Sequence, residues 1–172
     1  MLHRLLNRTT AIATMIALLP LTGGAAVYSN GSKTTTFDVT VTIIADCTIS
    51  ANPLDFGSSQ GVLSSALNVN SSLLVTCTNT TPYNVGLSAG TGTGSTASAR
   101  LMSGTGANTS TVAFNLNQTA GGGNWGNTQG TDTRSSTGTG SAQTLTVYGV
   151  VPAQATPQPD AYKSTITATV YF

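Results

Sequence analysis

Apolar and polar residues alternate with period two along most of the chain, and helical periodicity is nearly absent. The clearest run is residues 36–46, in which every second residue is a large apolar one: Phe37, Val39, Val41 and Ile43. Further strands are predicted over residues 53–57, 72–78, 83–88, 111–117, 143–151 and 162–172, which are rich in β-branched residues. About seven short strands in this length predict an all-β fold, an immunoglobulin-like β-sandwich.

Two stretches rich in Gly, Ser, Thr and Asn, residues 89–110 and 119–141, separate the later strands. We interpret them as long surface loops or irregular hairpins. A composition of this kind is also typical of disordered or glycosylated stalks. The periodic placement of apolar residues argues against that alternative for the chain as a whole, because disordered chains lack enough apolar surface to bury.

The last predicted strand has a continuous apolar face formed by Ile166, Ala168, Val170 and Phe172. The amphipathic strand at 36–46 has two possible uses. It is either the first strand of its own sandwich, or a strand that completes the sheet of another subunit by strand addition. The pattern alone favours the first use, because every sandwich needs a first strand.

Charged residues form only 6% of the chain, and there is no glutamate. The single histidine, His3, lies near the amino terminus. Histidine-based acid–base catalysis and His/Cys metal sites are therefore not expected. The few cations also exclude a basic nucleic-acid surface. We predict no catalytic residue, no metal, no cofactor and no small-molecule substrate, and therefore a protein that is not an enzyme.

The amino terminus has the three parts of a secretory signal peptide. Arg4 and Arg8 precede an apolar run over residues 11–21, and small residues at 24–26 suit cleavage after Ala26. The run is too short for a membrane span, which needs about 20 apolar residues. An exported chain with two cysteines predicts a disulfide between Cys47 and Cys77. Reactive thiols are the weaker alternative, because no base or cation lies near either cysteine in the sequence.

Several short motifs resemble, in order, those of spore coat protein U-like domains, a family that includes subunits of archaic, Csu-type chaperone–usher pili. They are Cys47 followed by Pro53-Leu54-Asp55-Phe56-Gly57, then Ser72 to Cys77, Arg100-Leu101-Met102, Phe114-Asn115-Leu116, Asn124-Trp125-Gly126, Tyr148 to Ala153, and Pro159 to Tyr162. Where the family usually shows Tyr-Asn-Leu-Tyr, this chain has Phe114-Asn115-Leu116-Asn117.

The resemblance implies three parts: a signal peptide (1–26), an overhang with a donor strand (27–46), and an incomplete immunoglobulin-like domain (47–172) that lacks its last strand. A periplasmic chaperone would fill the resulting groove first. At the outer-membrane usher, the donor strand of the next identical subunit would replace the chaperone. The donor residues would be Phe37, Val39, Val41 and Ile43. The carboxyl-terminal strand, with Ile166, Ala168, Val170 and Phe172, would form one wall of the groove.

The leading hypothesis is therefore a structural subunit of the pilus shaft, exported through the periplasm to the cell surface, where the fibre serves adhesion and biofilm formation. A second hypothesis is a secreted or coat-associated protein that works as a closed monomer of the same fold. A third is a carbohydrate-binding module in which Trp125, Tyr148 and Tyr162 stack on a sugar.

Overall fold

The computed structural model describes residues 30–58 and 63–172. The predicted signal peptide lies outside these residues. The described part of the chain contains ten strands and no helix. The strands are β1 (Cys47–Ala51), β2 (Leu67–Cys77), β3 (Pro82–Leu87), β4 (Arg100–Gly104), β5 (Thr111–Thr119), β6 (Gly122–Asn124), β7 (Arg134–Thr137), β8 (Gln143–Val151), β9 (Tyr162–Lys163) and β10 (Ala168–Tyr171).

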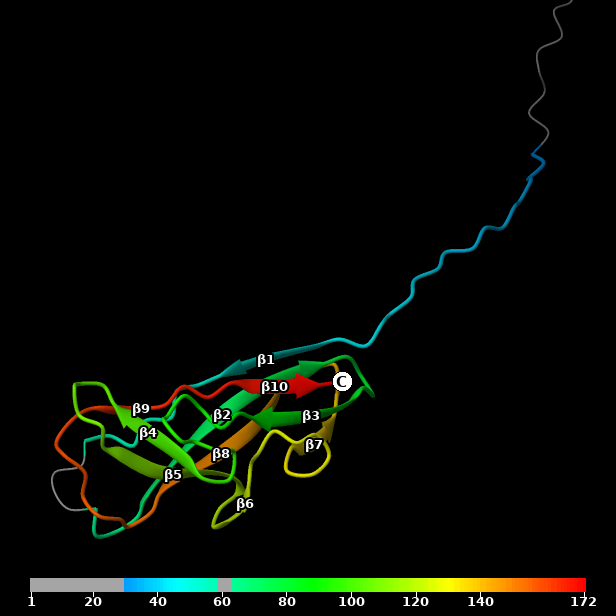
Figure 1. The fold of residues 1–172 in the computed structure, drawn as a ribbon. Coiled ribbons are helices and arrows are strands. Elements are labelled where there is room, and N and C mark those ends of the chain that lie inside the picture. Colours follow the sequence, from blue (N-terminus) through cyan, green and yellow to red (C-terminus); the bar gives the residue numbers. More distant parts are fainter. Residues whose placement is uncertain (1–29, 59–62) are drawn as a thin grey trace, which may run out of the picture. The chain divides into compact units, whose positions relative to one another are not determined.

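The described strands form two sheets, with every pairing antiparallel. The larger sheet has the order β1-β2-β8-β5-β4-β9, with β6 paired to β5 beside this path. The smaller sheet has the order β10-β3-β7. Figure 1 shows β1 and β10, which belong to different sheets, lying side by side and pointing in opposite directions.

One hydrophobic core joins the two sheets. Alternate residues of β2, β5 and β8 supply the larger sheet's share: Leu73, Val75, Phe114, Leu116, Leu145 and Val147. Tyr83, Val85 and Leu87 of β3 supply the share of the smaller sheet. The burial of every second residue is the reason that period-two alternation predicted these strands.

The predictions for the central strands are confirmed, and the differences lie around them. The prediction of a strand over 53–57 is wrong, because no strand is assigned there. Pro53 lacks a backbone N–H, and the segment is held instead by Ser71 Oγ, which donates to the carbonyl oxygens of Asn52 and Pro53. Leu54 and Phe56 alternate because they pack against the core, where they lie over Gly149 of β8.

The two stretches interpreted as long surface loops or irregular hairpins each contain strands. β4 lies within 89–110, and β6 and β7 lie within 119–141. β4 begins with Arg100, and β7 is the polar run Arg134–Thr137. Neither strand shows the alternation of apolar and polar residues that identifies a half-buried strand, so pattern reading missed both.

The predicted strand over 162–172 is interrupted. β9 and β10 are separated by residues 164–167, whose backbone is held by side chains of the loop after β3. Thr165 donates its N–H to Thr91 Oγ1, and Thr167 donates its N–H to Ser88 Oγ, each over 2.9 Å. Side-chain hydroxyl oxygens thus take the place of backbone carbonyl oxygens as the acceptors for the N–H groups of Thr165 and Thr167.

Candidate functional site

Two sheet edges remain without a partner strand where β1 and β10 run side by side. β1 ends the order of the larger sheet, and β10 ends the order of the smaller one. The two strands are neighbours in space but form no ladder with each other in the described part of the chain. Unpaired edges of this kind are templates for pairing with a further strand.

The register of β10 shows which of its backbone groups face the open edge. Ser88 donates its N–H to Thr167 O over 2.9 Å, so Thr167 and Ser88 form a hydrogen-bonded pair. Because such pairs alternate in antiparallel ladders, Ala168 and Val170, opposite Leu87 and Val85, direct their N–H and C=O groups away from β3. Leu87 donates its own N–H to Gly126 O, on the far side of β3, as this register requires.

An apolar cavity of about 520 Å³ lies beside this edge. Leu54 and Phe56 line it from the segment after β1, and Ile166 and Ala168 line it from the carboxyl-terminal segment. Its floor is the core itself, formed by Leu73, Leu87, Phe114, Leu116 and Val147. The cavity thus reaches the buried core residues from between the two sheets.

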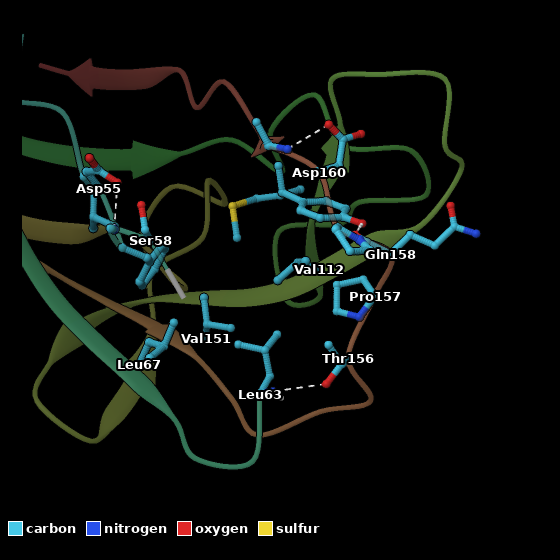
Figure 2. A pocket seen from close by; sticks show the side chains of 17 residues that line it. Asp55, Ser58, Leu63, Leu67, Val112, Val151, Thr156, Pro157, Gln158 and Asp160 are labelled. Carbon is cyan, nitrogen blue, oxygen red and sulfur yellow. Dashed lines mark hydrogen bonds between the residues drawn. The ribbon is translucent and has the colours of Figure 1, made fainter. Parts of the chain in front are cut away.

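A second cavity, of about 760 Å³, continues the first toward β4 and β9. The two cavities share Leu54, Phe56 and Met102, so we treat them as one acceptor groove. Figure 2 shows Leu63, Val112, Val151 and Pro157 among the side chains that line the second cavity. A groove with an apolar lining and free backbone groups along one wall suits an extended segment with alternating apolar side chains.

The segment after β1 forms one wall of the groove. Its side chains Leu54 and Phe56 lie close to the main chain of β8 at Gly149. A Cβ atom on Gly149 would lie 2.7 Å from Leu54 Cδ1 and 3.0 Å from Phe56 Cζ. Glycine at this position therefore lets both side chains lie flat on β8, which keeps the space beyond them open.

The predicted donor residues are all strongly exposed in the structure. Phe37, Val39, Val41 and Ile43 are between 76% and 86% exposed, and no strand is assigned to residues 30–46. Large apolar side chains in a regular row rarely stay in water without a binding role. Residues 30–40 belong to a separate unit of the chain.

The predicted groove-wall residues divide into two groups. Ile166, Ala168 and Val170 are partly buried and pack against the core, and the first two line the smaller cavity. Phe172 is 58% exposed and lines neither cavity. The structure contains the predicted disulfide, which joins Cys47 and Cys77 at the register position where β1 meets the end of β2.

A buried arginine, the first residue of the Arg100-Leu101-Met102 motif, ties the two sheets together. Arg100 of β4 is 1% exposed. It donates to the carbonyl oxygens of Leu87 and Ser88, each over 2.9 Å, to Trp125 O over 2.6 Å, and to Asn124 Oδ1 over 3.3 Å. Burial lowers the pKa of Arg100 to about 10, and the nearby Asp132 carboxylate partly opposes this. Backbone carbonyl oxygens thus take the place of water as hydrogen-bond acceptors for the buried guanidinium group.

Trp125, one of the three aromatic residues of the carbohydrate-binding hypothesis, is not exposed at the surface. Trp125 is fully buried and donates its indole N–H to Val85 O over 2.7 Å. The Arg134 guanidinium lies 5.7 Å from the centre of its ring. A tryptophan without an accessible face cannot stack on a sugar, so this residue acts as a packing anchor.

Residues 30–58 and 63–172 contain no group of three or more His, Cys, Asp and Glu side chains arranged to hold a metal ion. The same residues include no helix that is long and apolar enough to span a membrane.

The two facing sheets define an immunoglobulin-like β-sandwich with an open groove between two edge strands. The chain belongs to the Spore Coat Protein U domain family, whose sequence profile matches residues 33–169. This confirms the family resemblance read from the motifs. No curated protein sequence matches the chain.

The solved structures that match the chain include two from pilus systems. One is a chain of the CsuC–CsuE chaperone–tip adhesion subunit pre-assembly complex from archaic chaperone–usher Csu pili of Acinetobacter baumannii, with 22% identity and a TM-score of 0.56. The match covers 76% of this chain and 41% of that chain, so the present chain corresponds to less than half of its neighbour. The other is the E. coli Hda pilus minor tip subunit HdaB, with 15% identity, a TM-score of 0.39, and coverage of 72% and 78%.

Proposed function

We propose that the chain is a structural subunit of a chaperone–usher pilus, in which residues 36–45 of one subunit fill the acceptor groove of the next. The observation that carries this proposal is the pair of unpartnered edges, β1 and β10, beside an apolar groove that reaches the core. Family membership and the fold shared with a protein of the Csu pilus assembly support it.

The expected binding free energy of the donor strand is large enough for a stable contact between two subunits. Burial of four large apolar side chains stabilises by about 1.5–3 kcal/mol each, or roughly 6–12 kcal/mol as an upper estimate. Backbone pairing along about ten residues adds to this and covers an edge that would otherwise aggregate. Such a link needs no catalysis, cofactor or nucleotide.

The same groove would also bind the periplasmic chaperone, and the exchange of chaperone for donor strand would take place at the outer-membrane usher. Before assembly, a periplasmic chaperone inserts its own strand into the groove, and the outer-membrane usher is where the donor strand of the incoming subunit replaces it. We assign the chain to the shaft, because a shaft subunit needs both a donor strand and a groove. The assembled fibre is extracellular and serves adhesion and biofilm formation.

Expression of the full chain in a bacterial periplasm with a chaperone of this class tests the proposal. Unboiled samples are compared with boiled ones on denaturing gels, for the full chain and for a variant that lacks residues 27–45. We expect a ladder of resistant oligomers that collapses on boiling and is absent from the deletion variant. A monomer in every lane would favour the closed, secreted or coat-associated β-sandwich.

A further inference from the structure

We infer that the outward face of the larger sheet carries a binding site for a neutral glycan, centred on Tyr148 of β8. This face lies on the other side of β8 from the acceptor groove. Val147 and Gly149 are buried toward the core, so Tyr148 and Val150 face outward. The site goes beyond the proposed function and does not depend on assembly, because one chain carries all of its residues.

The two outward residues Tyr148 and Val150 have amide side chains on both sides. Four asparagines occupy outward positions of the strands next to β8 (Figure 1): Asn68 and Asn70 on β2, and Asn115 and Asn117 on β5. Asn70 and Asn117 lie directly opposite Tyr148, and the other two lie directly opposite Val150. Directly opposite side chains share a face of the sheet, with Cβ atoms about 4.5–5.5 Å apart. These six residues therefore form one block, which we call the asparagine platform.

The preferences of β-strands do not account for the four asparagines. Asparagine is depleted in strands because its amide competes with the backbone for hydrogen bonds, and β-branched or aromatic residues normally take its place. β2, β8 and β5 are inner strands of the larger sheet, so the platform is not a feature of a sheet edge. Positions at which a chain breaks such a local rule are expected at functional sites.

The polar groups of the platform are available to a ligand. Three of the four tyrosines that the structure describes donate their hydroxyl groups within the chain: Tyr83 to Gln143 Oε1, Tyr162 to Gln158 O, and Tyr171 to Asn127 Oδ1. Within residues 30–58 and 63–172, the hydroxyl group of Tyr148 and the side-chain amide of Asn70 have no hydrogen-bond partner. Asn70 is exposed, and Tyr148 and Asn117 are half-buried.

The chemistry of the platform matches that of a pyranose sugar. A pyranose ring has an apolar face of C–H groups and a rim of hydroxyl groups. The aromatic ring of Tyr148 and the side chain of Val150 provide an apolar strip for the face of the sugar. The amides on both sides of the strip each have two N–H donors and one oxygen acceptor, which suits hydroxyl groups that both donate and accept.

The lack of charge on these strands favours a neutral glycan. None of the residues of β2, β5 and β8 is charged. A sulfated or sialylated glycan would therefore meet no cation on the platform, and a nucleic acid would meet none of the basic side chains that its phosphates require. The centre of a protein interface is normally more apolar than one tyrosine and one valine between amides.

Binding of the full chain to an array of immobilised glycans tests the inference. The array carries neutral oligosaccharides of glucose, galactose, mannose and N-acetylglucosamine, together with sulfated and sialylated counterparts. We expect binding to neutral glycans that falls at least tenfold in Tyr148→Ser, which removes the stacking surface. Tyr148→Phe keeps the ring and loses only the hydroxyl group, so its binding should fall by less than about fivefold.

The amides are tested by an isosteric substitution. Asn70→Asp removes both N–H donors and should lower glycan binding at least tenfold. Asn79→Asp is the matched control, because Asn79 is exposed in the turn between β2 and β3, outside the platform, and should bind as the wild type does. The urea midpoints of all variants are measured alongside, and a loss of binding counts only where the midpoint is kept.

Three results on the array would overturn the inference: no glycan bound by the wild type, a preference for the charged glycans, or equal binding by the wild type and Tyr148→Ser. A face used for contact between copies of the chain would instead give slower sedimentation of Tyr148→Ser without any glycan binding, which also overturns it. Failure of the proposed function is distinct, because it appears as a monomer in every lane of the gel. A monomer that binds neutral glycans through Tyr148 would retain this inference.

Discussion

The guanidinium group of Arg100 donates a 2.6 Å hydrogen bond to the carbonyl oxygen of Trp125, and both residues are almost fully buried. Arg100 lies in the larger sheet, and its other two carbonyl acceptors are Leu87, the last residue of β3 in the smaller sheet, and Ser88, which follows it. Leu87 also belongs to the floor of the acceptor groove. One side chain therefore fixes the spacing of the two sheets close to the groove.

Replacement of Arg100 by lysine should destabilise the fold by about 2–4 kcal/mol, because an ammonium group cannot reach acceptors arranged for a planar fork and leaves buried carbonyl groups unpaired. The measurement is the urea midpoint of the monomeric variant lacking residues 27–45. Arg134→Lys is the control, since Arg134 is only partly buried and its bonds are 3.3 and 3.5 Å long. Equal losses for the two variants would contradict this role for Arg100.

The pH dependence of this contribution follows from the lowered pKa of Arg100, about 10. Below that pH, the guanidinium is protonated in the folded and the unfolded chain, so the cost of burying it is constant. Above that pH, the folded state releases its proton first, and the contribution to stability rises with pH. The stability difference between the wild-type and Arg100→Met domains should therefore be flat between about pH 6 and about pH 9. A slope within this range would show that another titrating group is coupled to Arg100.

Gly149→Val should lower both stability and assembly, because the new side chain would displace Leu54 and Phe56 from the surface of β8. We expect a loss of about 1–3 kcal/mol by overpacking. The displaced side chains would also narrow the groove, so the oligomer ladder should weaken more than the loss of stability alone explains. Val150→Ala in the same strand is the comparison. A ladder unchanged from that of the wild type would show that the wall after β1 takes no part in donor binding.

The two faces of the donor segment should respond differently to a charge. Val41→Asp should abolish the oligomer ladder, because the carboxylate would be buried without a partner in the groove of the next subunit. Thr42→Asp, one residue further on the polar face, should leave the ladder within about twofold of wild type, since its side chain would remain in water. Equal effects of the two substitutions would contradict the assigned register.

The groove wall can be tested with one small residue. Ala168 lines the smaller cavity beside the open edge of β10. Ala168→Phe should fill that space and block the donor strand, whereas Ala168→Gly should leave it open. The measurement is the binding of a synthetic peptide of residues 36–45 to the variant lacking residues 27–45, by fluorescence anisotropy. We expect at least a tenfold loss of affinity for the phenylalanine variant, and equal affinities would place the donor elsewhere.

The strands that form the core were predictable because burial repeats every second residue. β8 coincides with the predicted run 143–151, and β2, β3 and β5 overlap their predicted runs within a few residues. In each of them the buried positions are apolar. The alternation of apolar and polar residues in the sequence therefore matches the alternation of buried and exposed residues in the strand.

The strands that were missed hold their places by hydrogen bonds that leave no apolar pattern. β4 is fixed through the buried cation of Arg100, and a charged residue normally indicates a solvated position. The break at residues 164–167 depends on Ser88 and Thr91, which are more than 70 residues away in the sequence. The predicted donor residues were visible in the pattern, but the open edge proposed to bind them appears only when the sheet orders are known.

The disulfide between Cys47 and Cys77 has a mechanical consequence for a fibre built in this way. Tension on the fibre would enter each subunit through the donor segment, which only Asp46 separates from Cys47. At that point the covalent bond passes the load directly to β2, the longest described strand and one that pairs with both β1 and β8. The pulling force therefore bypasses the short ladder of β1, which would otherwise open one hydrogen bond at a time from its loaded end.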